Sequence, residues 1–310
     1  MVKRFFLYIY FMFSSKKRLD RAYKNAKVIE FNDDSKFILF SDCHRGDNSF
    51  ADDFANNRNI YYHALKYYYT EGFTYCELGD GDELWENLSF NSIFNAHKNV
   101  YLLMKLFHTA GRLHMIWGNH DMVYRDANYV KEHLSTYFEP KTGEDVSLFK
   151  NITYHEGLVL KHKKTQQEVF LTHGHQADWW NYTFWKWSRF MVRILWKPLN
   201  LMGVADPTSP AKNYKELIKV ERRTKKWIAD HNNLLTIVGH THRPRFPEPG
   251  DISFFNDGSC VHPRSITGIE IENSSISLIK WQISTKEDGT LQIVRTLLEG
   301  PRKLEDYKTD

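Results

Sequence analysis

The chain has 310 residues, 42% hydrophobic and 26% charged, so it can bury a full core and is not a disordered protein. Its 42 Lys and Arg against 38 Asp and Glu give a net charge of +4, which is too small to argue for a nucleic-acid partner. The three cysteines, Cys43, Cys76 and Cys260, are scattered and argue against a disulfide framework or a thiolate zinc site, which predicts a reducing, cytoplasmic compartment.

Residues 1–27 are predicted to form an apolar and basic N-terminal segment. The apolar run 5–13 has basic residues on both sides, and as a helix it would rise about 13 Å against a hydrocarbon core of about 30 Å. It therefore cannot span a membrane, and the lack of a small-residue cleavage site argues against a signal peptide. An anchor lying in the membrane interface and a segment packed on the domain remain as alternatives.

Strands and helices then alternate along the chain. Strands are predicted at 27–31 and 36–41, joined by the turn signal NDDS, and then at 73–79, 112–118, 151–162, 168–174 and 234–238. Helices are predicted within 52–69 and at 92–110. This alternation predicts an α/β fold with a largely parallel sheet. Four further strands, at 252–257, 265–272, 276–284 and 291–298, suggest a second sheet packed on the first.

Five predicted strands end in side chains that bind metal ions. The segments are ILFSDCHRGD, YCELGDGDELW, MIWGNHD, VFLTHGH and LTIVGHTH. One such strand end would be ordinary turn chemistry, but five in one chain indicate a site in the crevice beyond the carboxyl ends of the strands. The candidate donors are Asp42, His44, Asp80, Asn119, His173, His240 and His242.

These donors restrict both the kind and the number of ions. Carboxylate, neutral imidazole and amide groups together suit borderline divalent ions such as Mn²⁺, Fe²⁺ or Zn²⁺, whereas calcium prefers oxygen ligands alone. Seven donors are too many for one ion that must also hold water and substrate, so two ions are expected, with one carboxylate bridging them. Metals about 3.5–4 Å apart can hold the attacking and leaving oxygens of a displacement at phosphorus.

The order of the motifs resembles that of the calcineurin-like metallophosphoesterases. The motifs are Asp42-x-His44, Gly79-Asp80-x-x-Glu83, Gly118-Asn119-His120-Asp121, His173-Gly174 and Gly239-His240-x-His242. The resemblance covers residues 42–242 and implies a four-layer αββα sandwich.

The same resemblance implies how the ligands are shared between the ions. The first ion would be held by Asp42, His44 and His242, the second by Asn119, His173 and His240, and Asp80 would bridge the two. His240 and His242 stand two apart, and on an extended segment their side chains would point the same way, so each could serve a different ion.

The stretch GDGDELW offers two registers for the second motif. Starting at Gly79, Asp80 ends the strand and Glu83 follows three residues later. Starting at Gly81, the third residue after Asp82 is Trp85, which can neither bind a metal nor orient a side chain. We predict the first register, with Glu83 as partner of a catalytic histidine and Asp82 as the alternative partner, since members of the superfamily often have Asp at this position.

The expected reaction is hydrolysis at phosphorus. A water between the two ions would lose a proton and attack in line, while His120, aimed by Glu83, would stabilise the developing charge and protonate the leaving group. Arg45 and Arg243 stand beside ligands and could bind phosphate oxygens, although an ordinary surface charge explains either arginine equally well. His175 could line the same pocket.

An aromatic and basic helical insert is predicted at 178–232, between the core segments 28–177 and 233–300, with a tail at 301–310. If residues 179–201 form a helix, the four basic residues of that stretch form one stripe among Trp, Phe and Leu side chains: Lys186, Arg189, Arg193 and Lys197. Such a surface is typical of an interfacial membrane helix or of the lining of an acyl-chain groove. A lid buried on the core or in a dimer interface is the alternative. The turn-rich segment 206–213 precedes a second helix at 214–231.

The presence of a helical insert at this place, the pattern Glu83-x-Trp85 and the sequence GHTHRP are similar to the UDP-2,3-diacylglucosamine hydrolases. The resemblance implies manganese, a peripheral position on the inner membrane face, and cleavage of a pyrophosphate in a lipid precursor. The chain differs from that group in having His120 where arginine is usual, and in its N-terminal extension and insert. We expect a phosphodiesterase or pyrophosphatase acting on a lipid-linked or nucleotide-linked substrate.

Three alternatives share the same fold. A nuclease or cyclic-nucleotide phosphodiesterase would want a larger basic surface, because phosphate contacts dominate nucleic-acid affinity. A protein phosphatase-like monoesterase would use the same ligands. A non-catalytic scaffold would usually lack some ligands or the catalytic histidine, and this chain contains the full set.

Overall fold

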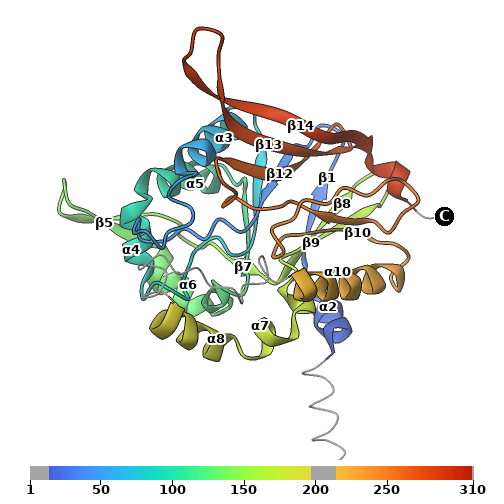
Figure 1. Ribbon diagram of the computed structural model, residues 1–310, viewed down its shortest axis with the longest axis horizontal. Helices are drawn as coiled ribbons and strands as arrows, with labels where there is room; N and C mark the ends of the chain where they lie inside the picture. The colour runs from blue at the N-terminus through green and yellow to red at the C-terminus, as the bar shows by residue number, and fades with distance from the viewer. Residues whose placement is uncertain (1–13, 197–213, 309–310) are drawn as a thin grey trace, which may run out of the picture.

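A computed structural model describes residues 14–196 and 214–308 of the chain. Two β-sheets face each other, and helices cover the outer face of each sheet, which gives four layers (Figure 1). The predicted α/β class and four-layer αββα sandwich are therefore confirmed. The apolar run 5–13 and the turn-rich segment 206–213 lie outside the described residues.

The larger sheet has seven strands with a parallel centre. In spatial order they are β14 (Leu291–Lys303), β13 (Ser275–Thr285), β12 (Ser265–Glu272), β2 (Phe37–Phe40), β3 (Thr74–Leu78), β4 (Leu113–Ile116) and β7 (Tyr154–His155). The last four run parallel, and β12 pairs antiparallel with β2, with Ile269 opposite Leu39. The expectation that the C-terminal strands build a second sheet is therefore wrong for β12, β13 and β14, which extend the first sheet.

The smaller sheet has five strands drawn from three parts of the chain. In spatial order they are β1 (Lys27–Phe31), β8 (Gly157–His162), β9 (Glu168–Thr172), β10 (Leu235–Val238) and β11 (Phe254–Asn256). Strands β1 and β2, separated by the predicted turn, thus belong to different sheets, because β1 pairs with β8. A separate hairpin is formed by β5 (Thr136–Glu139) and β6 (Glu144–Ser147).

Apolar side chains fill the space between successive layers. The larger sheet is covered by α3 (Arg58–Thr70), α4 (Phe90–Ala96), α5 (Lys98–Thr109) and α6 (Ala127–Leu134). The smaller sheet is covered by α2 (Ser15–Lys24) and α10 (Tyr214–Ala229). Between the sheets, Leu39 and Leu78 belong to one buried cluster with Leu171 and Ile237. Strands β2 and β10 are buried at every position because both of their faces are covered.

Both ends of the described chain pack on the sandwich. Helix α2 occupies part of the predicted N-terminal segment and buries Leu19 and Ala22. At the other end, β14 continues to Lys303, and the 3₁₀ turn η4 (Leu304–Tyr307) buries its first and last side chains between the sheets. Residues 301–308 therefore differ from the expected tail.

The insert is not one continuous helix. It begins with α7 (Trp179–Thr183), breaks at Phe184, and continues as α8 (Trp185–Met191) and the π-helical turn η3 (Val192–Trp196). The predicted second helix is α10. Lys186 and Arg189 lie on α8, whereas Arg193 lies in the π-helical turn, so these three residues do not share one regular α-helix, and Lys197 lies outside the described residues.

Replacing Trp227 by Ala should lower the free energy of unfolding by about 3–5 kcal/mol. Trp227 is buried on α10 beneath α2, and its Nε1 donates a hydrogen bond to Asp20 Oδ1 at 2.7 Å. The measurement is urea denaturation. Trp187→Ala is the control, because that side chain is 56% exposed and its loss should change stability by less than about 0.5 kcal/mol. Equal effects of the two changes would contradict the packing of α10 described above.

Candidate metal centre

The seven predicted donors meet at one edge of the two sheets. Strands β2, β3 and β4 run parallel, so the residues that follow them lie together, and the same is true for β9 and β10. The backbone N–H of His240 donates to Asp42 Oδ2 at 2.8 Å, which joins the strand ends of one sheet to those of the other. This hydrogen bond joins residues 198 positions apart in the sequence.

The first group of donors contains Asp42, His44 and His242, whose ligand atoms all lie within 4.8 Å of one another. His242 Nε2 is 3.1 Å from Asp42 Oδ1, and His44 Nε2 is 3.4 Å from His242 Nε2. One carboxylate and two imidazoles at these distances can hold a borderline divalent cation. The group is the same set that the resemblance assigns to the first ion.

The second group contains Asp80, His173 and His240, again with ligand atoms within 4.8 Å. Asp80 Oδ2 is 3.1 Å from His173 Nε2 and 3.9 Å from His44 Nε2, so this oxygen lies between the two groups. Its position matches that of a bridging carboxylate.

Asn119 is buried and has an unpaired side-chain amide. It is 1% exposed, and neither its oxygen nor its nitrogen makes a hydrogen bond with any residue that the structure describes. Its neighbour His120 donates its backbone N–H to Asp80 Oδ1 at 2.8 Å. A buried amide without partners is costly, and a cation beside the oxygen would satisfy it. The chemistry of these residues therefore fits divalent cations.

For two of the histidines, a hydrogen bond on the side away from the centre determines which ring nitrogen faces the centre. His173 Nδ1 is 2.8 Å from the carbonyl oxygen of Leu78 and donates to it, which leaves Nε2 as the nitrogen that faces Asp80. His44 Nδ1 is 2.8 Å from Glu83 Oε2, which likewise leaves Nε2 for the first group. Such contacts orient metal-binding imidazoles and fix their tautomers.

The charges of the centre shift the pKa values of its members. Burial alone would raise the pKa of Glu83, but His120 and His44 outweigh it and hold that pKa at about 2. Burial would also raise the pKa of Asp42 and Asp80, and the neighbouring histidines hold both well below the ordinary value. For His173, burial lowers the pKa, but Asp80 and Asp42 outweigh burial and raise it to about 9.

The backbone is strained at most of the ligands. The φ angle is positive at Asp42, His44, Asp80, His240 and His242, with values from 47° to 65°. Non-glycine residues rarely adopt this left-handed conformation, and such strain concentrates at functional sites. His240 and His242 therefore lie on a left-handed turn beyond β10, and the expected extended segment is wrong.

Glycines of the motifs allow the ligands to approach closely. A Cβ atom at Gly118 would overlap Oδ1 of Asp80, and a Cβ at Gly239 would lie 2.6 Å from Asp42 Oδ2. Any larger residue at these two positions would displace a ligand carboxylate. The requirement explains why a glycine precedes Asn119 and His240.

Glu83 and Trp85 together hold His120. Glu83 Oε1 is 2.8 Å from His120 Nδ1, while the other oxygen of the same carboxylate contacts His44. The ring of Trp85 stacks on that of His120, with centroids 4.1 Å apart and planes 21° apart. The carboxylate of Glu83 therefore lies between His120 and His44. The expectation that Trp85 cannot orient a side chain is wrong, because its ring packs flat against the imidazole.

Arg45 lies beneath the centre and does not face it. Its guanidinium is fully buried and donates to both oxygens of Glu77, at 2.7 and 2.8 Å, and to Asp82 Oδ1 at 2.8 Å. Asp82 also accepts hydrogen bonds from the hydroxyls of Tyr101 and Tyr124. These contacts contradict the predicted substrate-binding role of Arg45, because its donors are occupied. They also remove Asp82 as a partner of His120.

The other two predicted substrate contacts have different positions. His175 is fully buried, and its ring stacks on Tyr182, with centroids 5.5 Å apart. Burial lowers the pKa of His175 well below its ordinary value, so the ring is neutral. Its ring lies 5.3 Å from that of His173 and 6.4 Å from that of His240, centroid to centroid, so it is next to the second group. Arg243 is half-buried and directly follows the ligand His242.

Sequence reasoning missed Asp178, which contacts a ligand from behind. Its Oδ2 is 3.3 Å from His240 Nε2, and its Oδ1 accepts hydrogen bonds from the backbone N–H groups of Trp180 and Asn181. An Asp before an aromatic run is a signal for a helix N-cap, and this signal could have identified the capping role. The contact with His240 joins residues 62 positions apart, and no local pattern predicts it.

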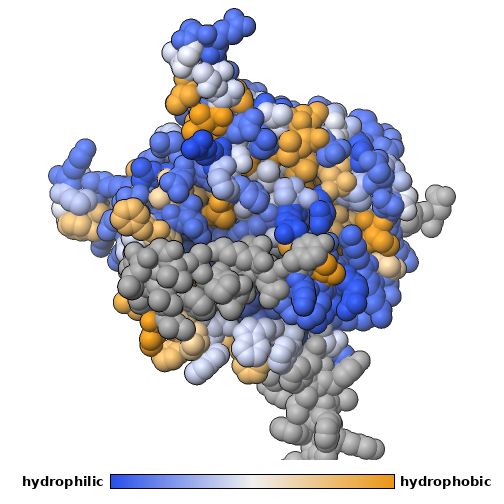
Figure 2. All heavy atoms as spheres, in the orientation of Figure 1, coloured by the Kyte–Doolittle hydropathy of each residue, from blue (hydrophilic) through white to orange (hydrophobic). Residues whose placement is uncertain are grey.

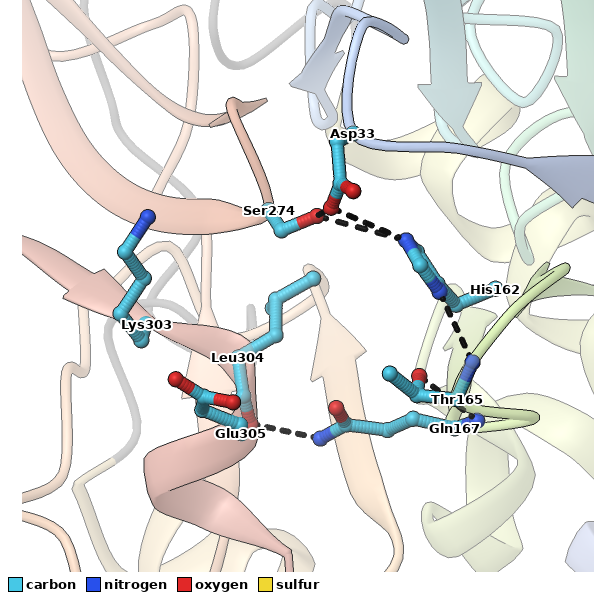
Figure 3. Close-up of a pocket in the computed structure, with 8 residues that line it drawn as sticks. All are labelled: Asp33, His162, Thr165, Gln167, Ser274, Lys303, Leu304 and Glu305. Atoms are coloured by element: carbon cyan, nitrogen blue, oxygen red, sulfur yellow. Dashed lines mark hydrogen bonds and ion pairs between the residues drawn. The ribbon is translucent and has the colours of Figure 1, made fainter.

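A separate pocket lies at the opposite end of the smaller sheet (Figure 3). His162, at the carboxyl end of β8, is 3.2 Å from Asp33 Oδ1 and accepts a hydrogen bond from the N–H of Thr165. Strands β8 and β9 are antiparallel, so this end is remote from His173. None of the predicted site residues lines the pocket.

Two solved structures share a remote likeness with the chain. One is Vacuolar Protein Sorting 29 from Cryptosporidium parvum, with a TM-score of 0.34 and 14% identity, covering 86% of this chain and 98% of that chain. The other is Vps29 from Chaetomium thermophilum, with a TM-score of 0.35 and 10% identity, covering 85% and 95%. Likenesses at these TM-scores carry no argument. No protein-family model and no curated protein matches the chain.

Affinity for Mn²⁺ should rise with pH between about 6.5 and 9, because a cation competes with the proton on His173. The pKa of His173 is raised by folding, so its protonation stabilises the metal-free protein fully below pH 6.5, and this contribution is lost as the pH passes about 9. Isothermal titration calorimetry in buffers of different ionisation enthalpy measures the affinity and the protons released. An affinity independent of pH over this window would contradict the assignment of His173 as a ligand.

Proposed function

We propose that the chain is a dinuclear metal-dependent phosphoesterase that hydrolyses a phosphodiester or pyrophosphate bond. The observation that carries this proposal is the position of Asp80 between two groups of donors, with His120 beside them. The donor set favours Mn²⁺, with Fe²⁺ and Zn²⁺ as alternatives. The resemblance of the motifs to the calcineurin-like metallophosphoesterases supports the same reaction.

The ions would be held by residues from both sheets. When bound, two divalent cations lower the pKa of water and neutralise charge on phosphate oxygens. The chain contributes their ligands, which are Asp42, His44 and His242 on one side, Asn119, His173 and His240 on the other, and Asp80 between them. The left-handed turns and the hydrogen bonds behind the imidazoles hold these donors in place before substrate binds, so little reorganisation is needed during the reaction.

His120 is placed to act as the general acid. Glu83 holds its Nδ1, so Nε2 is left to donate a proton to the leaving oxygen. The ring lies 4.6 Å from that of His44, edge to face, which positions it beside the first group. The carboxylate of Glu83 orients the imidazole through Nδ1, and the ring of Trp85 packs flat against it.

We infer further that the substrate carries a lipid tail and that the protein binds a membrane surface. The support for this proposal is the exposed apolar surface of the insert. Between residues 178 and 196, its large exposed apolar side chains are Trp180, Phe184, Trp187, Phe190 and Ile194. Figure 2 shows hydrophobic side chains gathered over α8. Lys186, beside the ring of Trp185, adds positive charge to the same surface. Among the described helices, none is both long and apolar enough to cross a bilayer.

Replacing His120 by Ala should lower kcat about 10²–10⁴-fold while two Mn²⁺ ions still bind, because the residue donates a proton and holds no metal. The measurement is turnover of a soluble aryl phosphodiester by the manganese-loaded protein, with metal content determined on the same sample. Asp80→Asn is the comparison, and it should lose metal as well as turnover. A metal-loaded His120→Ala protein with normal turnover would refute the role of His120.

Replacing Trp187 and Phe190 together by Ser should lower co-sedimentation with anionic phospholipid vesicles by about tenfold or more per residue. Turnover of the soluble diester should not change, whereas cleavage of a lipid pyrophosphate in vesicles should fall. Leu291→Ser is the control, because this side chain is 71% exposed at the start of β14, in the hairpin that projects away from α8 (Figure 1). Activity confined to a monoester, with no vesicle binding by the unaltered protein, would overturn the lipid proposal.

A further inference from the structure

One end of the first part of the insert contacts a donor of the metal centre, and the other end contacts the loop that carries Glu83 and Trp85. Residues 178–196 leave the core at Asp178, immediately after the segment that carries His173 and His175, and reach Arg193 in the π-helical turn η3. Asp178 contacts the ligand His240, and Arg193 contacts the loop that follows Asp80. The insert therefore bridges elements that hold different parts of the centre.

Arg193 points inward and binds three backbone carbonyls of one loop. Its Nε donates to the carbonyl oxygen of Trp85 at 3.2 Å, and its Nη2 donates to those of Leu84 and Asn87, each at 3.0 Å. A guanidinium can satisfy several carbonyls from one fixed plane, whereas a lysine ammonium offers a single point of charge. The basic residue predicted for a membrane-facing stripe is thus engaged with the protein itself.

The loop held by Arg193 carries the groups that position His120. Glu83 contacts His120 and His44 through its two carboxylate oxygens, and it also accepts the backbone N–H of Trp85 at 3.2 Å. Trp85 contributes the ring stacked on His120. A shift of this loop would therefore move the proposed acid and one metal ligand together.

Asp178 divides its two oxygens between the insert and the second group of donors. One oxygen caps α7, and the other is 3.3 Å from His240 Nε2 and 2.9 Å from Asn181 Nδ2. A carboxylate on the far nitrogen of a ligand imidazole fixes its orientation and raises its basicity. Because Nε2 of His240 is engaged in this way, Nδ1 is the nitrogen left for a cation.

We propose that Asp178 and Arg193 are positioning residues through which the insert braces both sides of the metal centre. Asp178 acts through His240, and Arg193 acts through the loop that carries Glu83 and Trp85. The proposal rests on the proposed function only in its effect on turnover. The contacts also affect the affinity for metal ions and the protection of the loop's backbone amides from hydrogen exchange. Both quantities can be measured without any substrate.

Arg193→Met and Arg193→Lys test the first contact. In both variants, the backbone amide hydrogens of residues 84–88 should exchange with deuterium faster than in the unaltered protein. Both substitutions should also lower kcat on the soluble diester by about 10–100-fold, with little change in KM. Lysine keeps the positive charge of Arg193. If both variants show faster exchange and lower kcat, the hydrogen bonds of the guanidinium, and not its charge alone, hold the loop. Arg222→Met is the matched control, because Arg222 is exposed on α10 and the charge change is the same. Unchanged exchange and kcat in both Arg193 variants would overturn this half of the proposal.

Asp178→Asn tests the second contact, because asparagine caps a helix as well as aspartate does, while it lacks the negative charge beside His240. The affinity for Mn²⁺ measured by calorimetry should fall about 10–100-fold for one of two ions, with α7 still protected from exchange. Unchanged affinity for both ions would overturn this half. If the unaltered protein binds two ions but cleaves none of the phosphoesters, the proposed function fails, whereas the exchange and affinity results still decide the bracing proposal.

Discussion

The burial of two carboxylates and three imidazoles, with the half-buried imidazole of His242 beside them, is the constraint on which the rest of the site depends. Asp42 and Asp80 are almost fully buried, and the histidine nitrogens around them lie 3.1–3.9 Å away. Taking such groups out of water is costly unless charges and hydrogen bonds compensate. The compensating features are local: glycines that admit the carboxylates, carbonyl and carboxylate acceptors behind the imidazoles, and the amide of Asn119 turned to the same place.

The candidate metal-binding residues could be predicted from the sequence because each motif is short. Each one also follows directly after a strand that the hydrophobic pattern reveals. Arg45 could not be placed in this way, since its partner Glu77 lies 32 positions away and on another strand. The same limit applies to the sheets. The pairing of β12 with β2, which adds the C-terminal strands to the first sheet, depends on the register of Ile269 with Leu39 and not on any local pattern. Local periodicity identifies strands but not their neighbours.

The insert illustrates a second limit of local patterns. Its basic residues at three- and four-residue spacing suggest one amphipathic helix, yet the chain breaks at Phe184 and ends this part in a π-helical turn. The extra residue in that turn changes the direction of the side chains that follow. Arg193 is consequently directed toward carbonyls of the loop 84–87, while Trp187 and Phe190 stay exposed. The same segment thus combines an inner, polar contact with an outer, apolar surface.

The left-handed backbone at the ligands has a consequence for how such a centre can change over evolutionary time. Asn, Asp and His are the non-glycine residues that tolerate this conformation best, and they are also donors for divalent cations. At Asp42 or His240, exchange among these three would alter the hardness of the donor set without rebuilding the turn. Aliphatic and β-branched replacements would instead incur a conformational penalty. The backbone therefore permits substitutions that change which divalent ion is preferred. It disfavours substitutions that remove a metal-binding side chain.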